Sequence, residues 1–348
     1  MAGALLPDQH HLVAGWDPWH GSGFMRFVYL MDGLDRVLPD KDTTFALQRA
    51  AQRRGHTALF CQIPDLTNDG GEPFALVREL RVSDTAPYFA LGEPRQVALA
   101  GVDAIFIRKD PPFDSHYLYA TLMLERARGR TVIMNDPRGL RDANEKLYPL
   151  HFVRHMPRTM VTAREDKTRE FLTRVGGKAV IKPLYGAGGA GVLMLVEGDP
   201  NVRSIIETVT REGRELAMVQ EFLPAVRQGD KRVLLLDGEV LGGINRVPRA
   251  DDIRSNIHVG GSVHEIDVTA EERAIVADIA PRLRDDGLIF VGLDFIGGKL
   301  TEVNVTSPTG IQQLSQHMKR DVAADVIAWV EKRVHEMKPH HPSLAPAP

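Results

Sequence analysis

The sequence predicts a mixed α/β and α+β protein that begins with an open parallel sheet and continues with two α+β parts. The first observation is that short apolar runs alternate with helical patterns over residues 25–142, as in a parallel sheet covered on both faces. The second is a glycine cluster at residues 186–191, between two predicted strands. The third is that apolar runs come in pairs joined by Asp-Gly or Gly-Gly after residue 229, which is typical of β-hairpins.

The first domain is predicted over residues 25–142. It opens with the apolar run 26–31, whose length and composition suit a buried strand. Asp42 is expected to cap a helix that runs to Arg54 and ends at Gly55. The other expected elements of this domain are strands at residues 58–63, 103–107 and 130–134, and a helix at residues 116–128.

Two α+β parts are predicted to follow, a small lid over residues 143–228 and an antiparallel part over 229–337. The expected elements of the lid are strands at residues 159–162, 178–184, 192–196 and 216–222, and helices at 165–175 and 201–211. In the antiparallel part, Thr269 is expected to cap a helix that runs to Asp285. The remaining expected elements are hairpins over residues 232–247 and 288–305, and a last helix over 321–336.

The composition is that of an ordinary globular protein. Of 348 residues, 43% are hydrophobic and 26% are charged, with a formal net charge of −3. A net charge this small gives no overall electrostatic attraction for nucleic acid, and no apolar run approaches the length of a membrane span. Neither nucleic acid nor a membrane is therefore expected as a partner. The single cysteine, Cys61, lies in an apolar run and is expected to be a buried strand residue in a cytoplasmic protein.

The two ends of the chain lack the patterns of folded elements. Residues 1–24 contain prolines, aspartates and histidines without periodicity, and we expect them to form a disordered N-terminal extension. Residues 338–348 are rich in proline and histidine and are expected to form a disordered tail.

Lys182 lies near the end of the predicted strand 178–184, shortly before the glycine cluster. It is expected to point to the same side as Val180, away from the core. A cation followed by Gly186, Gly188 and Gly189 offers a charge and close backbone N–H groups to phosphate oxygens. The G-x-G-x-x-G spacing also occurs in dinucleotide-binding folds, where it opens a helix, but here a strand follows. The loop is therefore expected to be a flap over nucleotide phosphates, with a plain hairpin tip as the alternative.

Glu302 and Asn304 are two residues apart in a β-rich run, so both side chains leave the same face of one strand. Two hard oxygen ligands on one face suit Mg²⁺, which completes its octahedron with water and nucleotide phosphates. A two-residue turn at residues 297–298 would turn Asp294 away from Glu302, whereas a three-residue loop over 297–299 with a bulge would place the two carboxylates together. We expect the three-residue form, and the acids and the lysine together predict a site for MgATP.

The strand end at residues 220–223 is a candidate adenine site. Backbone groups at Gln220, Phe222 and Leu223 can read the edge of a base, and Glu221 can accept a hydrogen bond from its amino group. Asp230, shortly afterwards, can accept from a ribose hydroxyl. A strand that enters a loop needs no ligand, and this remains the alternative.

Basic residues recur around the predicted cleft. Arg108 and Lys109 follow a strand of the open sheet, where ligands bind, and are expected to hold a substrate carboxylate. Lys146, between the first domain and the lid, is a second phosphate candidate, with a surface helix position as its alternative. Arg254 lies in a long segment without a secondary-structure pattern, residues 248–261, which is expected to be a second lid.

Over residues 25–334 the chain closely resembles the bacterial glutathione synthetases, a family of ATP-grasp ligases. The resemblance rests on five long segments, which read KDTTF at residues 41–45, RKDPPFD at 108–114, LRDANEK at 140–146, GDKRV at 229–233 and TEVNVTSP at 301–308. It implies an ATP-grasp fold behind the N-terminal open parallel α/β domain, with ATP held between two α+β parts.

The resemblance also implies roles for individual residues. The nucleotide residues would be Lys146 and Lys182 for the phosphates, Glu221 to Leu223 for adenine and Asp230 for ribose. The metal ligands would be Asp294, Glu302 and Asn304, binding two Mg²⁺ or Mn²⁺ ions. Arg232 and Arg254 would hold the reacting carboxyl phosphate, and the substrate contacts would include Arg108, Lys109, Arg246, Asn256 and Ser307.

The implied reaction joins γ-glutamylcysteine to glycine through an acyl phosphate made from ATP, in a homo-oligomeric enzyme. Two alternatives stay open. One is another ATP-grasp carboxylate–amine ligase, and the other is a non-catalytic ATP-binding protein of the same fold, similar to the synapsins. The segment at residues 249–256 departs from the family, because two acids and an isoleucine stand where small residues are usual. This leaves the acceptor amine less well defined than the ATP site.

Overall fold

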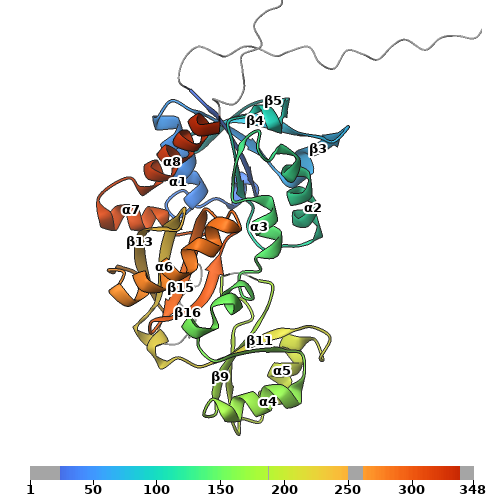
Figure 1. Cartoon of the computed structure of the whole chain (residues 1–348), viewed down its shortest axis with the longest axis vertical. Coiled ribbons are helices and arrows are strands. Elements are labelled where there is room, and N and C mark those ends of the chain that lie inside the picture. Colours follow the sequence, from blue (N-terminus) through green and yellow to red (C-terminus); the bar gives the residue numbers. More distant parts are fainter. Residues whose placement is uncertain (1–23, 187, 250–261, 338–348) are drawn as a thin grey trace, which may run out of the picture.

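The computed structural model describes residues 24–186, 188–249 and 262–337. Its first sheet has the predicted parallel centre, and the strands that form it are β1 (Arg26–Met31), β2 (Thr57–Cys61), β6 (Ala104–Arg108) and β7 (Val132–Met134). These strands are short and almost wholly apolar because helices cover both faces of the sheet, as Figure 1 shows.

The sheet is mixed, which corrects the expectation of a purely parallel sheet. Three strands join it antiparallel beside β2, namely β3 (Leu66–Asp69), β4 (Glu72–Val82) and β5 (Phe89–Ala98). Gly70 and Gly71, both with positive φ, form the tight turn from β3 into β4. The strand β4 alternates buried and exposed side chains, so one of its faces belongs to the core while β5 lies largely in solvent.

Helices from both ends of the chain cover this sheet. On one face, α1 (Thr43–Arg53) packs beside the last helix, α8 (Val322–Met337). On the other face lie α2 (Ser115–Leu124) and α3 (Pro137–Asp142). Asp42 caps α1 as predicted, because its Oδ1 accepts the Phe45 N–H at 2.7 Å. Figure 1 shows the red C-terminal helix against the blue N-terminal one.

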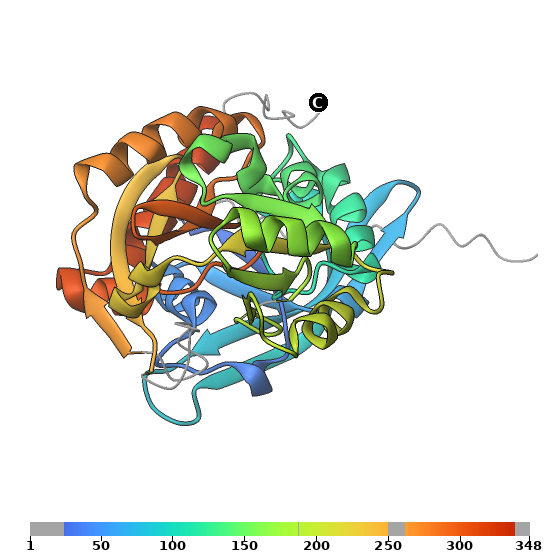
Figure 2. The ribbon, with the colours of Figure 1, turned by 90° about the horizontal axis from the view of Figure 1, so that it is seen from below.

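The predicted lid is a four-stranded antiparallel sheet in the order β10-β9-β11-β8. Its strands are β8 (Thr159–Thr162), β9 (Lys178–Pro183), β10 (Leu193–Val196) and β11 (Ala217–Glu221). The amphipathic helices α4 (Glu165–Arg174) and α5 (Val202–Thr210) bury their apolar sides against it in a small separate core. Figure 2, seen from below, brings this part of the molecule to the front.

The third sheet is antiparallel, in the order β14-β13-β12-β15-β16. Its strands are β12 (Asp230–Leu236), β13 (Glu239–Val247), β14 (Ser262–Glu265), β15 (Phe290–Ile296) and β16 (Lys299–Asn304). The helix α6 (Ala270–Asp285), capped by Thr269 as predicted, packs on one face, and α7 (Ile311–Met318) packs on the other. The short 3₁₀ helices are Leu34–Arg36, Ile63–Asp65, Leu99–Gly101, Glu125–Ala127, Tyr148–His155 and Pro224–Gln228.

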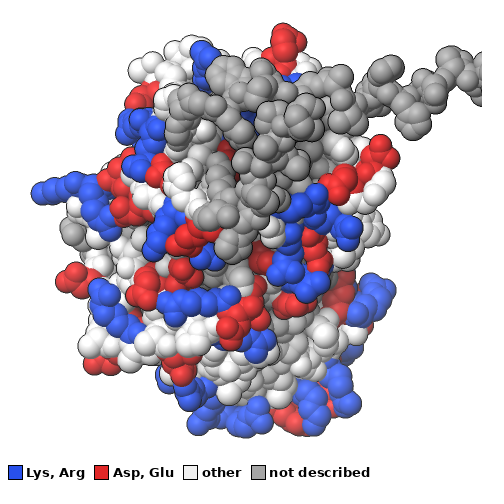
Figure 3. All heavy atoms as spheres, turned by 45° about the horizontal axis from the view of Figure 1, so that its top comes forward, with Lys and Arg blue, Asp and Glu red and all other residues white. Residues whose placement is uncertain are grey.

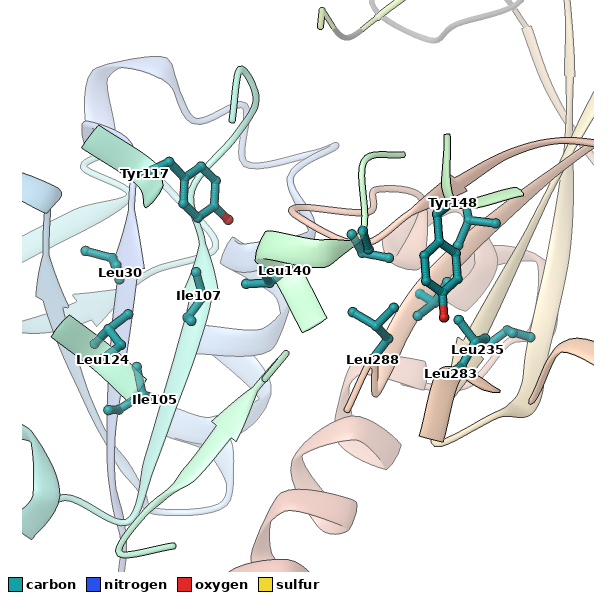
Figure 4. Packing of buried hydrophobic residues seen from close by; sticks show 14 of the residues in the cluster. Leu30, Ile105, Ile107, Tyr117, Leu124, Leu140, Tyr148, Leu235, Leu283 and Leu288 are labelled. Atoms are coloured by element: carbon teal, nitrogen blue, oxygen red, sulfur yellow. The ribbon is translucent and has the colours of Figure 1, made fainter. Parts of the chain in front are cut away.

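The first and third sheets share one continuous core. In Figure 4, Leu30 of β1 and Ile105 and Ile107 of β6 lie on one side, Leu235 of β12 lies on the other, and Leu140 of α3 lies between them. Asn135 adds a polar link, because its amide donates to the carbonyl oxygens of Phe290 at 2.9 Å and Val305 at 2.8 Å and accepts the N–H groups of residues 289 and 290. The strands that form the third sheet are therefore held firmly on the first domain.

The surface charge is mixed. On the face shown in Figure 3, the described basic and acidic side chains are interspersed, in agreement with the small net charge. No helix in the described part of the chain is both long enough and apolar enough to cross a membrane.

Candidate functional site

A cleft of about 580 Å³ lies where the first domain, the lid and the third sheet meet. All of the residues predicted for the nucleotide and the metal line it, namely Lys146, Lys182, Gly186, Gly188, Gly189, Gln220, Glu221, Phe222, Leu223, Asp230, Asp294, Glu302 and Asn304. Arg232, Arg246 and Ser307, predicted for the reacting groups and the substrate, line it as well. The structure thus brings together side chains that lie up to 161 residues apart in the sequence.

Asp294 lies directly opposite Glu302 in the β15–β16 ladder, as the metal hypothesis requires. The reason given for this from the sequence is wrong, however. Ile296 pairs with Lys299, so the turn has two residues, and both glycines, 297 and 298, have the positive φ that such a turn demands. The extra residue is Thr301, which bulges out of β16 and restores the alignment.

Asp294 is enclosed by cations at the floor of the cleft. Arg232 binds both of its oxygens, with Nη2 at 2.9 Å from Oδ2, and Arg246 Nη2 lies 3.0 Å from the same oxygen. Burial alone would raise the pKa of Asp294, but attraction to Arg232 and Arg246 outweighs it and holds the pKa well below its usual range. Arg246 also donates to Asp230 Oδ2 at 2.7 Å. It therefore connects Asp230, which is predicted to bind the ribose, to Asp294, which is predicted to bind the metal.

The two predicted phosphate lysines flank Glu302. Lys182 Nζ lies 3.6 Å and Lys146 Nζ 3.8 Å from Glu302 Oε1, and both lysines are buried. Burial lowers the pKa of Lys182, and the carboxylate of Glu302 opposes this effect. As expected, Lys182 points away from the core that Ala179 and Ile181 enter. Two buried ammonium groups in one cleft are a strong attraction for a polyanion.

The glycine loop leads from β9 into β10, so it opens a strand and not a helix, as predicted. Gly186, Gly188 and Gly189 have positive φ, a backbone conformation that favours glycine, and all three line the cleft. Lys146 Nζ donates to the Gly186 carbonyl at 2.9 Å and fixes the start of the loop.

The donor set of the floor fits a hard divalent cation. Glu302, Asn304 and Asp294 supply only oxygen ligands from one patch of two paired strands. The amide nitrogen of Asn304 donates to Gly292 O and to Asp294 Oδ2, both at 3.2 Å, which leaves its oxygen as an acceptor. Among the described residues no cluster of three or more His, Cys, Asp or Glu side chains suits a metal by itself. A cation held here would need phosphate or water oxygens to complete its shell.

Arg108 and Lys109 are placed elsewhere. Arg108 is buried and donates to Thr44 Oγ1 at 3.1 Å and to the Pro308 carbonyl at 3.0 Å, so it ties β6 to the segment after β16. Lys109 pairs with Asp32 at 3.0 Å. Neither lines the cleft, and a direct contact with substrate stays a prediction for both. Arg254 and Asn256 lie outside the described residues.

Five charged residues to which the sequence assigned no place in the site also line the cleft. The first domain contributes Arg36, Lys41, Asp42 and Asp110, and the junction before the lid contributes Glu145. Lys41 and Asp42 belong to the KDTTF segment. The sequence analysis explained Asp42 only as a helix cap and therefore did not place it in the site. Burial raises the pKa of Asp42, and its hydrogen bond from Phe45 N–H opposes the shift.

Comparison of the sequence with protein families matches nearly all of the chain between residues 25 and 319. The description "Prokaryotic glutathione synthetase, N-terminal domain" matches residues 25–141, and "Prokaryotic glutathione synthetase, ATP-grasp domain" matches residues 145–319. A glutathione synthetase of Synechococcus elongatus is 42% identical over 323 residues, covering 90% of this chain and all of the relative. That of Brucella melitensis is 43% identical over 311 residues, covering 89% and 99%.

Solved structures share the fold, among them the ATP-grasp ligase PsnB, which aligns with a TM-score of 0.54 at 15% identity, over 90% of this chain and 97% of that one. The D-cycloserine synthetase DcsG aligns with a TM-score of 0.62 at 17% identity, over 88% of this chain and 99% of that one. D-alanyl-alanine synthetase A of Vibrio cholerae aligns with a TM-score of 0.57 at 10% identity, over 90% and 99%. At these identities the likeness concerns the fold alone, and it confirms the expected ATP-grasp architecture.

Proposed function

The chain belongs to the prokaryotic glutathione synthetase family, and from this premise we propose that its cleft binds ATP and γ-glutamylcysteine and joins the peptide to glycine. The protein is an ATP-dependent carboxylate–amine ligase that makes glutathione. The observation that carries the site assignment is the position of Glu302, which lies between Lys146 and Lys182 and opposite Asp294 within one cleft.

ATP lies between the lid and the third sheet in this proposal. The triphosphate contacts Lys146, Lys182 and the glycine loop, because the two lysines are buried cations that line the cleft and a glycine loop can offer backbone N–H groups to phosphate oxygens. The base lies against residues 220–223 and the ribose near Asp230, which share the same wall. When bound there, one or two Mg²⁺ or Mn²⁺ ions held by Asp294, Glu302 and Asn304 would neutralise phosphate charge.

The peptide occupies the side formed by the first domain. γ-Glutamylcysteine carries an ammonium group and two carboxylates, and this wall offers the cations Arg36 and Lys41 beside the acids Asp42 and Asp110. Arg246 and Ser307 also line the cleft and stay predicted substrate contacts. Asn256, which lies outside the described residues, stays a predicted contact too.

The chemistry follows from the weakness of a carboxylate as an electrophile. An oxygen of the cysteinyl carboxylate attacks the γ-phosphorus of ATP, ADP leaves, and the carboxylate becomes an acyl phosphate. The glycine nitrogen then attacks the acyl carbon, phosphate leaves with the bonding electrons, and the amine loses its proton. Arg232 stabilises negative charge on the acyl phosphate, and Arg254 is proposed to assist. Closure of the cleft protects the acyl phosphate from water.

Two further expectations concern the protein in the cell. A reaction that consumes ATP and whose peptide substrate carries a free thiol suits the reducing cytoplasm, and we propose this location. The homo-oligomeric state also stays a proposal, which light scattering of the purified protein tests directly.

The decisive experiment measures ADP release and peptide formation in parallel. With ATP, Mg²⁺, γ-glutamylcysteine and glycine, we expect about one ADP per glutathione. Without γ-glutamylcysteine, ADP release should fall to background, since no acyl phosphate forms. Equal turnover with another amine in place of glycine would favour a different carboxylate–amine ligase, and nucleotide binding without turnover on any amine would favour a non-catalytic protein.

The same assay tests Arg254. If its guanidinium covers the acyl phosphate, Arg254→Ala should slow peptide formation and raise the ratio of ADP to peptide, because water reaches the electrophile. Arg169→Ala, at an exposed position of α4, is the matched control. An unchanged rate and ratio would remove Arg254 from the mechanism.

A further inference from the structure

Glu145, which lies in the junction between α3 and the lid, receives four hydrogen bonds from one short segment. Its backbone carbonyl accepts Val303 N–H at 3.1 Å. Its Oε1 accepts the N–H groups of Val305 at 3.0 Å and Thr306 at 3.1 Å, and the Thr306 hydroxyl at 2.8 Å. A carboxylate that accepts several such bonds is a strong anchor, because each bond is charge-assisted.

The segment that Glu145 holds is the end of β16, which carries two of the three predicted metal ligands. The strand β16 is an edge strand, so the N–H groups on its outer side have no strand partner within the sheet. Glu145 takes the place of that partner at residues 303 and 305. Since side chains alternate along a strand, fixing these two positions also fixes the direction in which Glu302 and Asn304 project.

The neighbouring residues link the same junction to the lid. Lys146 Nζ donates to the Gly186 carbonyl, and Asn144 Nδ2 donates to the Leu184 carbonyl at 3.2 Å. Residues 144–146 therefore contact both the strand that bears the metal ligands and the start of the glycine loop. Lys146 also lies 3.8 Å from Glu302, so the two contact sets meet in the cleft.

We propose that Glu145 is a positioning residue for the ligase reaction, which sets the end of β16, and with it Glu302 and Asn304, at the correct place relative to the phosphate lysines. This inference rests on the proposed function of the cleft. Glu145 acts through the backbone of β16 and the Thr306 hydroxyl, so its effect is on the metal-dependent part of nucleotide binding and not on the contacts of the base.

The experiment compares nucleotide affinity with and without metal. A non-hydrolysable ATP analogue is titrated into the protein by calorimetry, once with Mg²⁺ and once with EDTA, and the ratio of the two dissociation constants is the metal-dependent gain. For Glu145→Ala we expect this gain to fall about tenfold while the affinity in EDTA stays within about twofold. Glu170→Ala, on an exposed face of α4, should leave both affinities unchanged.

Two additional measurements separate positioning from a general loss of structure. Glu145→Gln keeps an acceptor oxygen and the side-chain length, so it should fold even where Glu145→Ala does not, and it should show a smaller loss of the metal-dependent gain. In a double-mutant cycle with Glu302→Gln, the two losses should not add, because both act on the same ligands.

The outcomes are distinct. An unchanged metal-dependent gain in both Glu145 variants, or equal losses with Mg²⁺ and with EDTA, would overturn the proposal. Fully additive losses in the cycle would do the same. Failure of the proposed function would appear elsewhere, as absence of peptide formation by the unaltered protein, whose metal-dependent nucleotide binding can still be measured.

Discussion

Arg232 and Asp294 face each other on the neighbouring strands β12 and β15 and form a buried ion pair in which one guanidinium binds both carboxylate oxygens. Their side chains are only 6% and 4% exposed. A pair of this kind can be removed together at little cost, but loss of one partner leaves a buried charge without its main counter-ion. The same ion pair therefore affects both the stability of the third sheet and the chemistry of the cleft.

Arg232→Met should lower stability and activity together. The loss of a buried partner is expected to cost on the order of 3 kcal/mol, and the loss of charge stabilisation should reduce turnover roughly 10²-fold to 10³-fold. Combining Arg232→Met with Asp294→Asn should restore much of the melting temperature but none of the activity. Calorimetric melting and the peptide assay measure both effects, and a single variant that melts like the parent would contradict the structural role of the pair.

Glu302→Gln should affect turnover far more than nucleotide affinity. The carboxylate is a proposed metal ligand, while Lys146, Lys182 and the backbone of the glycine loop remain to hold the phosphates. We expect turnover to fall on the order of 10³-fold, which corresponds to several kcal/mol of transition-state stabilisation. Glu207→Gln, on an exposed face of α5, is the control. Near-normal turnover at limiting Mg²⁺ would exclude Glu302 as a ligand.

The local patterns of the sequence predicted most of the elements and the residues of the cleft floor. Capping by Asp42 and Thr269, and the outward direction of Lys182, follow from spacing over a few residues, and the structure confirms them. The alignment of Asp294 with Glu302 was predicted correctly, but from a three-residue loop, whereas the structure has a two-residue turn. A three-residue loop and a two-residue turn followed by a bulge at Thr301 give the same alignment, so the sequence around the two glycines does not distinguish these two arrangements.

Contacts between distant segments could not be predicted in the same way. The hydrogen bonds of Glu145 to residues 303–306 and of Arg108 to Pro308 span about 160 and 200 residues, and they depend on how the first and third sheets dock. The strand β4 is a different case, because its alternating pattern was visible in the sequence. The prediction of this domain used only the alternation of strands and helices that is typical of parallel sheets, and it therefore did not include an antiparallel hairpin beside β2.

Glu331 of α8 should make the protein sensitive to acid. Its carboxylate binds Arg54, with Nη2 at 2.5 Å, and His56 Nε2 at 2.6 Å, and these contacts connect α8 to the end of α1. The hydrogen bond from Arg54 lowers the pKa of Glu331 from 4.5 to about 2. Since the folded pKa is depressed, the stabilisation is complete above about pH 4.5 and is lost as the pH falls toward 2.

Glu331→Gln tests this link. At neutral pH the variant should melt several degrees below the parent, because bonds to a charged group are lost, and the difference should shrink as the pH falls from 4.5 toward 2. Glu336→Gln, five residues further along α8 in an exposed position, should follow the parent at every pH. A difference between Glu331→Gln and the parent that does not depend on pH would show that the ion pair is not its cause.

Residues 1–22 should be dispensable, provided that the cut does not reach the first strand. The family match begins at residue 25, and Met25 N–H donates to the buried ring of His56 at 3.1 Å while the Met25 carbonyl accepts Thr57 N–H at 2.9 Å. A chain that begins at Gly23 keeps this peptide group intact and should retain the melting temperature and the activity of the full chain. A chain that begins at Met25 would place a charged terminal amine against His56, which is joined to Glu331, and should melt a few degrees lower. If the cut at Gly23 lowered either quantity, residues 1–22 would have to contribute to the folded protein. Equal melting of the two truncated chains would instead show that the hydrogen bond between Met25 and His56 tolerates a charged donor.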